Sequence, residues 1–463
     1  MPLRTVIKRG STTVIQAFRR SHSTKGDVFK IRSNSSLFQD IFPDNARSEI
    51  SSLLQSGQQC VYAGFDPTAD SLHVGNLLVL INLLHWQRAG HRTIAVIGGA
   101  TAQIGDPSGR STERPELAEQ KALNNAAGLE ANIQTIYRNH EEIIWRGQQP
   151  LLPVLVYNNL SWYKDLDFVR FMADVGRHFR VGTMLSRHSV QTRMASEAGI
   201  SFTEFSYQLF QAYDWLHLYR NHDCRFQIGG NDQMGNIVSG HDLISRTENQ
   251  KVYGLTLPLV TSEAGDKFGK SAGNAVWLDP KKTSPFELYQ FFIRTPDSIV
   301  STLLKLFTFL PDSELLEITQ QQQVKPELRT AQRTLAEQVT LLVHGEKGLR
   351  SAELATSTLY KQSLDSLSQL SAEEVHSLFG EASCREIKFR PESTALELAM
   401  DASCFPTEAD AKRIIKAGGF SINNKKITDP SEIINSKEHM LPNGITLLRV
   451  GKKNYYVLKW QYS

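Results

Sequence analysis

Cysteines and long apolar segments are both scarce in this sequence of 463 residues. No two of its four cysteines stand at CxxC spacing, so we expect neither a zinc knuckle nor a disulfide framework; they are Cys60, Cys224, Cys384 and Cys404. Because no run of about 18 apolar residues occurs, we expect no transmembrane helix and no membrane partner. With 40% hydrophobic and 21% charged residues, the composition is ordinary for a globular protein of about two to four domains.

The N-terminus lacks acidic side chains, because the first acid of the chain is Asp27. Residues 1–25 contain six bases among several Ser and Thr: Arg4, Lys8, Arg9, Arg19, Arg20 and Lys25. This composition predicts a mitochondrial transit peptide over residues 1–25 and a location in the mitochondrial matrix, with a disordered basic arm as the alternative. Without these bases the net charge of +3 becomes −3, so a polyanion must bind at a local basic patch.

Apolar strands alternate with helices from about residue 58. The segments QQCVYAGF, RTIAVIGGA, LLPVLVYNN and CRFQIGGNDQ are typical of buried strands, and LLVLINLLHWQRAG is typical of an apolar helix that ends at Gly90. This alternation predicts the α/β class, with a Rossmann-like doubly wound parallel sheet in a domain over residues 26–284.

Two further regions are predicted beyond the sheet. Residues 285–378 have apolar residues at helical spacing, and their first helix is expected to begin at Ser284-Pro285 with Glu287 in its first turn. Residues 379–463 predict a small α+β domain with a Gly-Gly turn and a second turn at Asn423-Asn424. Residues 411–463 contain ten Lys or Arg and three Asp or Glu, so this last region is basic.

A helix N-terminus follows the first predicted strand, in the segment VYAGFDPTADSLHVGNL. We expect this helix to begin near Ser71-Leu72, with His73 and Gly75 in its first turn. Unpaired N–H groups and the positive end of the helix dipole favour an anion there, and His73 adds a donor for phosphate oxygens. Gly75 leaves room for a flat ring. The alternative is that His73 only caps the helix.

A glycine-rich basic loop, GDKFGKSAGN, occupies residues 265–274. Lys267 and Lys270, followed by Ser271, could hold a pyrophosphate group while charge develops on it. The alternative is a solvated basic loop.

A third group is expected on one face of a helix in FTEFSYQLFQAYDWL, where Tyr207, Gln211 and Asp214 stand four and three residues apart. A buried acid beside an amide and a phenol is unfavourable unless a ligand satisfies it. The alternative is a polar patch that is satisfied within the protein.

The first two segments together resemble the HIGH and KMSKS signature pair of the class I aminoacyl-tRNA synthetases. Longer strings resemble the tyrosyl-tRNA synthetases from about residue 40 to the end: YAGFDPTADSLHVGN, GGATAQIGDPSGR, YQLFQAYD, QIGGNDQMGN, KFGKS and SAGNAVWLDPKKTSPFELYQFF. The resemblance implies ATP-dependent activation of L-tyrosine to tyrosyl-adenylate with release of pyrophosphate, then transfer of tyrosine to the 3′ end of tRNA(Tyr). It also implies Mg²⁺ with the ATP, no protein-bound metal, and a homodimer whose interface is an insertion at about 140–205.

The resemblance assigns a role to individual residues of the tyrosine pocket. Tyr62 and Asp214 would bind the phenol hydroxyl of the substrate. Its ammonium group would be held by three residues, Asp106, Tyr207 and Gln211. Gln233 would lie near the amino acid and the adenylate.

The family's ATP site maps onto this chain in the same way. Asp66 would lie near the adenylate, and Gly230 with Asp232 would contact the ribose. Thr68 and His73 would stabilise the pentacoordinate α-phosphate as the catalytic groups, together with Lys267 and Lys270. The remaining members of the predicted ATP site are Gly75, Asn76 and Ser271. Arg110 and Arg114 would add positive charge on the other side and are candidates for tRNA contact.

This sequence departs from the family pattern at two positions. Asn76 replaces the second His of the HIGH motif, and an amide there can still donate a hydrogen bond. Ala63 replaces a Cys that is frequent in bacterial relatives, which removes one contact to the ribose. The alternatives to the main prediction are a tryptophanyl-tRNA synthetase and a non-catalytic RNA-binding protein that assists intron splicing. The pair Tyr62 and Asp214 argues against the first.

The last region, AKRIIKAGGFSINNKKITDP, resembles an RNA-binding domain of the alpha-L type. Its predicted phosphate contacts are Lys412, Arg413, Lys416, Lys425 and Lys426. By the same resemblance, the helical region 285–378 would bind the anticodon stem.

Overall fold

The computed structural model describes residues 26, 28–30, 37–110, 112–114, 117–147, 149–258, 269–271, 274–360, 368, 371, 375, 379, 384–388, 390, 392–451 and 454–461. The predicted transit peptide, residues 1–25, lies outside the described residues. The chain divides into two compact units. The first comprises Met1–Val276 and Pro296–Ala331, and the second comprises Trp277–Thr295 and Gln332–Ser463.

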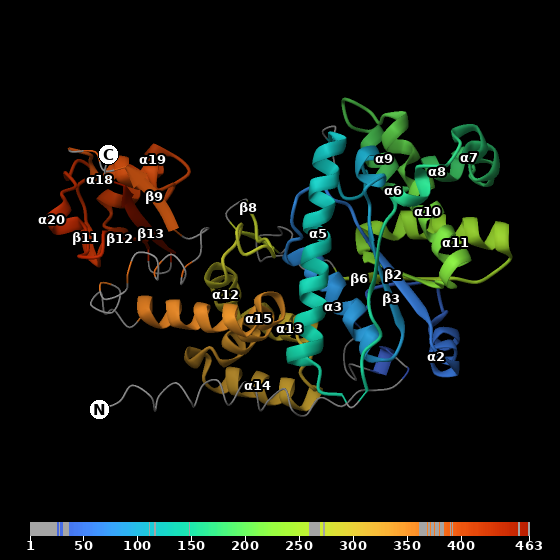
Figure 1. Cartoon of the computed structure of the whole chain (residues 1–463), viewed down its shortest axis with the longest axis horizontal. Coiled ribbons are helices and arrows are strands. Elements are labelled where there is room, and N and C mark those ends of the chain that lie inside the picture. Colours follow the sequence, from blue (N-terminus) through green and yellow to red (C-terminus); the bar gives the residue numbers. More distant parts are fainter. Residues whose placement is uncertain are drawn as a thin grey trace. The chain divides into compact units, whose positions relative to one another are not determined.

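The first unit is built on a six-stranded sheet with the order β1-β6-β5-β2-β3-β4 (Figure 1). Its strands are β1 (Ile41–Phe42), β2 (Cys60–Phe65), β3 (Arg92–Ile97), β4 (Leu155–Asn158), β5 (Phe226–Gly230) and β6 (Tyr253–Leu257). All pairs are parallel except β1 with β6. Strand β2 lies in the middle of the sheet, and β3 and β4 are added in turn on one side of it. Strands β5 and β6 are then added in turn on its other side. This is the doubly wound α/β arrangement that the sequence predicts.

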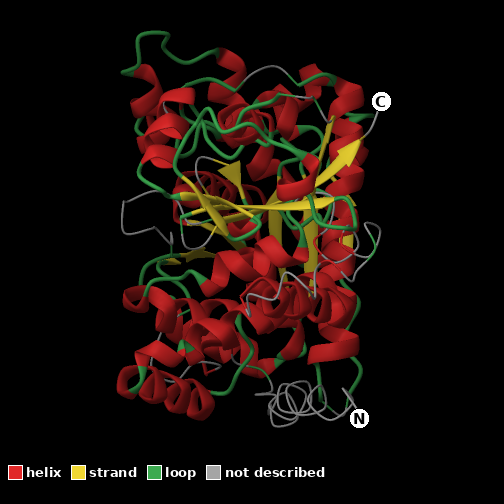
Figure 2. Ribbon diagram, turned by 90° about the vertical axis from the view of Figure 1, so that its left-hand side faces the viewer, coloured by secondary structure: helices red, strands yellow, loops and turns green. Residues whose placement is uncertain are grey.

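Helices pack on both faces of this sheet, and Figure 2 distinguishes the helices (red) from the strands (yellow). On one face, Trp86 of α3 (Val74–Arg88) packs on Phe226 of β5, with ring centroids 4.9 Å apart. Phe226 pairs with Val61 across the sheet, so the next residue along β2, Tyr62, points to the opposite face. There Trp215 of α10 (Phe202–His222) packs on Tyr62, with centroids 6.0 Å apart. The candidate tyrosine pocket therefore belongs to the face that α10 covers.

Helix α3 begins two residues later than the sequence predicts. It starts at Val74, with extended His73 as its N-cap residue, and not near Ser71-Leu72. Asn76 explains the shift, because its side-chain Oδ1 accepts a hydrogen bond of 3.1 Å from the backbone N–H of His73. The helix ends at Arg88, and Gly90 follows with a positive φ of 89°, as predicted for a glycine that ends a helix.

The remaining helices of the first unit connect these strands or follow them. They are η2 (Val28–Lys30), α2 (Arg47–Ser56), α4 (Thr101–Ile104), α5 (Glu119–Asn139), η3 (His140–Ile144), α6 (Leu160–Tyr163), α7 (Phe168–Asp174), η4 (Gly176–His178), α8 (Val181–Leu185), α9 (His188–Met194), η5 (Asn231–Gln233), α11 (Met234–Glu248), α13 (Asp297–Phe307), α14 (Asp312–Val324) and η6 (Pro326–Leu328). Two short strands, β7 (Lys270–Ser271) and β8 (Asn274–Ala275), form a separate antiparallel pair.

The second unit begins with α12 (Pro285–Ile293), whose start agrees with the sequence prediction. Ser284 Oγ accepts a hydrogen bond from Glu287 N at 3.2 Å, and the Glu287 carboxylate accepts one from Ser284 N at 2.9 Å. All but the first two residues of α15 (Thr330–Tyr360) also belong to this unit, and the helix contains a non-helical glycine, Gly345.

A five-stranded sheet with the order β11-β10-β12-β13-β9 completes the second unit. Its elements are β9 (Cys384–Lys388), α18 (Ala395–Asp401), α19 (Glu408–Lys416), β10 (Phe420–Ile422), β11 (Lys425–Ile427), α20 (Ser436–His439), β12 (Ile445–Val450) and β13 (Asn454–Gln461). Asn423 and Asn424 both have positive φ, 47° and 64°, and form the predicted turn between β10 and β11.

Candidate active site

The candidate site lies at the carboxyl ends of β2 and β5, which are neighbouring parallel strands. The strands that follow β2 are added on one side of this pair, and the strand that follows β5 is added on the other side. Ligands bind at such a reversal point in doubly wound sheets, because the loops that leave the two strands diverge there. Asp66 follows β2 directly, and η5, which contains Asp232 and Gln233, follows β5. Gly230 is the last residue of β5 and is half-buried, as are Asp232 and Gln233.

Asp66 connects this strand end to α10 and to the loop after β3. Its Oδ2 accepts a hydrogen bond of 2.8 Å from the Tyr207 hydroxyl, and its Oδ1 accepts one of 2.8 Å from the Thr101 hydroxyl. A Cβ atom at Gly98 would overlap both the Asp66 carboxylate and the Thr101 hydroxyl, so this contact needs glycine. Burial raises the pKa of Asp66 to about 6, and the charge of nearby Asp106 contributes in the same direction. Thr101 and Gly98 were not predicted as site residues, although both lie in the GGATAQIGD string.

Asp106 is held by three donors. Its Oδ2 accepts a hydrogen bond of 2.7 Å from Gln233 Nε2, while its Oδ1 accepts bonds from Ser108 N at 2.9 Å and from Asn236 Nδ2 at 3.3 Å. Two predicted residues, Asp106 and Gln233, are therefore in direct contact although 127 residues separate them. Ser108 and Asn236 were missed, since neither spacing nor composition marks them.

Asp214 of α10 lies among three side chains that follow β4. Asn159 Nδ2 donates to its Oδ2 at 3.1 Å, and Trp162 Nε1 donates to its Oδ1 at 2.9 Å. The Tyr163 hydroxyl lies 2.9 Å from the same Oδ1. Burial raises the pKa of Asp214 to about 7. The sequence prediction missed these three neighbours, which belong to the segment YNNLSWY at the end of a predicted strand.

Tyr62 is the other predicted contact for the substrate phenol. Its side chain is 1% exposed, and its hydroxyl has no hydrogen-bond partner among the described residues. Burial raises the pKa of Tyr62 well above its usual value, and the charge of Asp214 raises it further. A buried hydroxyl without a partner is unfavourable, so this atom fits a ligand that supplies the missing hydrogen bond.

The two signature segments meet at the N-terminus of α3. Val74 N donates to Val276 O at 2.9 Å, and Val276 N donates to Gly269 O at 2.8 Å. Gly269, within the KFGKS string, has a φ of +96°, and a Cβ atom there would lie 3.2 Å from Gly75 N. The backbone of the basic loop is thus placed against the helix N-terminus near His73.

Other predicted members of the ATP site are described only in part. Thr68 is exposed and His73 is half-buried. Lys270 and Ser271 form β7, and nothing is described of their side chains. Lys267 lies outside the described residues.

Gln211, Arg110 and Arg114 complete the predicted set in this unit. Gln211 is half-buried, one helical turn after Tyr207 on α10. Arg114 Nε donates to the backbone oxygen of Asp106 at 3.5 Å. Burial lowers the pKa of Arg110, and the charge of Arg114 lowers it further.

The predicted RNA contacts in the second unit lie on α19 and β11. Three of them pair with acidic neighbours: Lys412 with Glu408, Arg413 with Asp410, and Lys425 with Glu432 and Glu438. The basic member of each of these ion pairs is exposed, so it can exchange its acidic partner for a phosphate. Lys416 and Lys426 lie on the same two elements.

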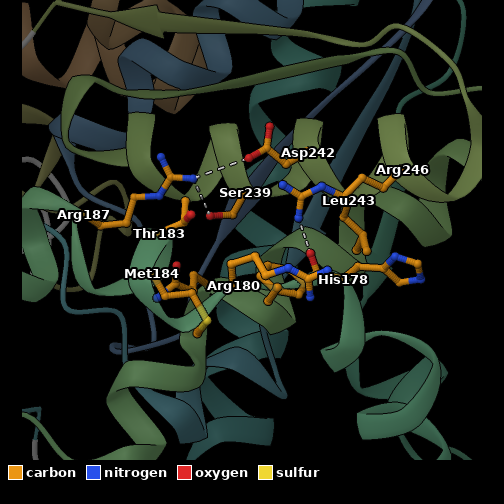
Figure 3. Close-up of a pocket in the computed structure, with 11 residues that line it drawn as sticks. His178, Arg180, Thr183, Met184, Arg187, Ser239, Asp242, Leu243 and Arg246 are labelled. Carbon is orange, nitrogen blue, oxygen red and sulfur yellow. Dashed lines mark hydrogen bonds and ion pairs between the residues drawn. The ribbon is translucent and has the colours of Figure 1, made fainter.

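A separate hollow lies between the segment 178–187 and α11 (Figure 3). Arg187 reaches Ser239 at 3.4 Å and Asp242 at 3.9 Å, and Arg246 donates to the backbone oxygen of His178. None of the predicted tyrosine or ATP residues lines this hollow. Within the described residues, no group of three or more His, Cys, Asp or Glu could hold a metal ion, and no helix is long and apolar enough to span a membrane.

Comparisons with known proteins identify the family to which this chain belongs. A family model described as tRNA synthetases class I (W and Y) matches residues 55–361, and one described as a tyrosine–tRNA ligase SYY-like C-terminal domain matches residues 375–458. The chain is 53% identical to the mitochondrial tyrosine–tRNA ligase of Drosophila melanogaster over 100% of both chains. It is 45% identical to that of Homo sapiens over 96% of this chain and 94% of the human one. A C-terminally truncated mitochondrial tyrosyl-tRNA synthetase of Aspergillus nidulans superposes with a TM-score of 0.66 at 32% identity, over 76% of this chain and 99% of that one.

These relatives are tyrosine enzymes, so the tryptophan and non-catalytic alternatives are not favoured. Doubly wound topology, the two adjoining signature segments and identity along the whole chain lead to one family. The chain belongs to the mitochondrial tyrosine–tRNA ligases, which are class I aminoacyl-tRNA synthetases.

Proposed function

We propose that the space between β2, β5 and α10 binds L-tyrosine for adenylation, with its phenol hydroxyl between Tyr62 and Asp214. The observation that supports this is the buried Tyr62 hydroxyl, which has no partner among the described residues. A phenol both donates and accepts a hydrogen bond, so it can satisfy a hydroxyl and a carboxyl together. Phenylalanine would leave the Tyr62 hydroxyl buried and without a partner, which makes its binding unfavourable.

The charged end of the substrate would face the carboxylates near β2 and β5. Asp66 and Asp106 are acceptors for an ammonium group, and Tyr207 and Gln233 already contact them. Gln211 would complete this end of the pocket from α10. A positive group close to these acids also offsets the repulsion between Asp66 and Asp106 that contributes to the raised pKa of Asp66.

ATP would lie between the N-terminus of α3 and the basic loop. A carboxylate oxygen of tyrosine attacks the α-phosphorus, and the bond from this phosphorus to the pyrophosphate oxygen breaks. Thr68 and His73 would stabilise the α-phosphate, while Mg²⁺ with Lys267, Lys270 and Ser271 would stabilise the leaving pyrophosphate. Four residues would hold the nucleoside: Gly75, Asn76, Gly230 and Asp232.

The RNA-binding functions would follow the predicted domain organisation. We propose that region 285–378 contacts the anticodon stem and that residues 379–463 form an alpha-L type domain for tRNA(Tyr). Arg110 and Arg114 are further candidates for tRNA contact. Exposed cations on α19 and β11 support phosphate contact in the C-terminal domain. The proposed location is the mitochondrial matrix, to which the transit peptide within residues 1–25 would direct the chain.

A homodimer is proposed through the insertion at about 140–205. Four large apolar side chains of this segment are strongly exposed in the isolated chain: Phe168, Val169, Val181 and Phe202. Exposed apolar side chains of this size in one segment indicate a surface that another chain covers. A second copy is the natural occupant, because symmetric dimers are the commonest soluble oligomers.

Pyrophosphate exchange and tRNA charging with each aromatic amino acid test the proposed pocket. Tyrosine should drive exchange, and Asp214→Ala should reduce the preference for tyrosine over phenylalanine by about tenfold or more. Asp174→Ala, which changes an exposed acid on α7, is the matched control and should keep the preference. Exchange driven by tryptophan alone, or an unchanged preference in Asp214→Ala, contradicts the proposed pocket.

A further inference from the structure

The hydroxyl of Tyr163 lies within hydrogen-bond distance of two oxygens. It is 2.8 Å from the backbone oxygen of Phe210 and 2.9 Å from Asp214 Oδ1. A phenol has one hydrogen, and a backbone carbonyl oxygen can only accept. If Tyr163 donates to Phe210, the contact with Asp214 needs a hydrogen that comes from Asp214. If Asp214 were ionised, the Phe210 oxygen and Asp214 Oδ1 would both be acceptors, and the Tyr163 hydroxyl would have only one hydrogen for the two of them.

The contacts of Asn159 show which hydrogen bond the other oxygen of this carboxyl group, Asp214 Oδ2, makes. Asn159 Oδ1 accepts a hydrogen bond of 2.7 Å from Ala100 N, which can only donate, so the atom of Asn159 that faces Asp214 is Nδ2. Asp214 Oδ2 therefore accepts from Asn159. Because a carboxyl oxygen has two lone pairs, Oδ2 retains one for a further donor.

Trp162 fits the same assignment. Its Nε1 can only donate, and it lies 2.9 Å from Asp214 Oδ1. A protonated Oδ1 can accept from Trp162 and at the same time donate to Tyr163. Each hydrogen of this cluster then has one acceptor.

The surroundings of Asp214 also disfavour a negative charge. Among the described residues, no lysine or arginine forms an ion pair with it. The titratable groups that interact with it are phenols and one acid: Tyr62 from β2, Tyr163 from α6, Tyr207 and Tyr213 from α10, and Asp66 after β2. His217 of α10 stacks on Trp162 with ring centroids 4.5 Å apart, and burial lowers its pKa. Burial raises the pKa of Asp214 to about 7, in agreement with the geometry.

We propose that Asp214 is a neutral carboxylic acid in the unliganded enzyme and that its protonated Oδ1 donates a hydrogen bond to the Tyr163 oxygen. Tyr163 is then a positioning residue for tyrosine recognition. The free lone pair of Oδ2 accepts the substrate's phenol hydrogen, and the Tyr62 hydroxyl donates to the phenol oxygen. The substrate is then selected by one neutral acceptor and one donor. This inference rests on the proposed tyrosine pocket.

The direction of hydrogen bonding gives opposite predictions for Tyr163→Phe. In the proposed network Tyr163 accepts from the neutral acid, so its loss removes a partner of the protonated form and lowers the pKa of Asp214. If Tyr163 instead donated to an ionised Asp214, the same substitution would raise that pKa. The sign of the shift therefore distinguishes the two networks.

Infrared difference spectroscopy of the unliganded full-length enzyme measures this proton directly. A band of a protonated carboxylic acid should be present in the wild type near neutral pH, be absent in the isosteric Asp214→Asn, and titrate at lower pH in Tyr163→Phe. Tyr213→Phe is the matched control, because its ring lies 5.6 Å from that of Tyr163 and it has no hydrogen bond to Asp214 among the described residues. Absence of the band in the wild type, or its titration at higher pH in Tyr163→Phe, overturns the proposal.

Steady-state kinetics of the same variants show whether the proton on Asp214 affects the recognition of tyrosine. Tyr163→Phe should raise KM for tyrosine by about tenfold and change kcat little, because the Asp214 carboxyl group loses the hydrogen bond that orients its Oδ2 toward the substrate. The pH at which KM changes should move downward with the infrared titration. An unchanged KM and KM–pH profile would contradict a positioning role for Tyr163. Failure of the proposed pocket is separate, since it would show as unchanged selectivity in Asp214→Ala while the infrared band of the free enzyme remained.

Discussion

Tyr62 and Trp215 pack against each other with ring centroids 6.0 Å apart, and this contact holds the Tyr62 ring in the core while its hydroxyl has no partner among the described residues. The neighbouring acid, Asp214, has three hydrogen-bond partners and is fixed in place. The pocket thus contains one acid, Asp214, whose hydrogen bonds come from the protein. It also contains one hydroxyl, that of Tyr62, for which the substrate would supply the hydrogen bond. The two groups should respond differently to substitution.

Removing the Tyr62 hydroxyl should affect binding and not folding. Tyr62→Phe should raise KM for tyrosine by about tenfold, because the phenol loses a donor. The free energy of unfolding should be unchanged or higher, since no hydrogen bond within the protein is lost. Steady-state pyrophosphate exchange and chemical denaturation measure the two effects.

Tyr137→Phe is the matched control for this experiment. Tyr137 is also buried, but its hydroxyl bonds to Thr93 at 3.3 Å. Its substitution should cost about 1 kcal/mol of unfolding free energy and leave KM for tyrosine unchanged. If Tyr62→Phe behaves like Tyr137→Phe, the Tyr62 hydroxyl does not contact the substrate.

Two acids with raised pKa values predict how stability depends on pH. The pKa of Asp214 is about 7 and that of Asp66 about 6, both raised by burial above an unfolded value of about 4. Between pH 4 and 7 the folded chain therefore holds protons that the unfolded chain has released. These two groups should make the free energy of unfolding fall as the pH rises through this window, by up to about 1.4 kcal/mol per pH unit for each proton.

Denaturation of Asp214→Asn at several pH values isolates one of these contributions. Its unfolding free energy should fall less steeply from pH 4 to 7 than that of the wild type. Asp242→Asn is the control, because a hydrogen bond from His241 lowers the pKa of Asp242, so this acid holds no extra proton in the folded state. Identical slopes for Asp214→Asn and the wild type would show that Asp214 holds no extra proton in the folded state.

The sequence indicates the strands, the helix α10 and the position of its acid, because apolar periodicity and spacing are local properties of the chain. It could not reveal Asn159, Trp162 and Tyr163 as neighbours of Asp214, since more than 50 residues separate each of them from that acid. Their contact depends on α6 and α10 lying beside each other. Likewise, the start of α3 shifted because the side chain of Asn76, and not helix propensity, determines where the helix begins.

Disrupting the exposed apolar surface of α7 should separate the proposed homodimer. Phe168→Asp places a charge where a 70% exposed phenylalanine would be covered by a second copy, so the dimer should dissociate at micromolar concentration. Sedimentation of the purified protein measures the change. Leu316→Asp, on α14, is the control, because that side chain is also exposed but lies outside the insertion. A monomeric wild type, or a Phe168→Asp dimer as stable as that of the Leu316→Asp control, would contradict the proposed interface.

Lys270 offers a test of the basic loop that is independent of the tyrosine pocket. Gly269, the residue before it, lies against the N-terminus of α3, so the backbone of the loop at this point is near the proposed phosphate site. Lys270→Ala should lower the rate of adenylate formation by about a hundredfold or more, because charge on the leaving pyrophosphate loses its partner in the transition state. KM for tyrosine should change little, since the phenol pocket is formed by other residues.

Pre-steady-state kinetics measure the rate of adenylate formation directly, and the exposed Lys281→Ala is the control. A Lys270→Ala enzyme that forms adenylate at the wild-type rate would remove the loop from the mechanism and leave the pyrophosphate to be stabilised by Mg²⁺ and the helix terminus alone.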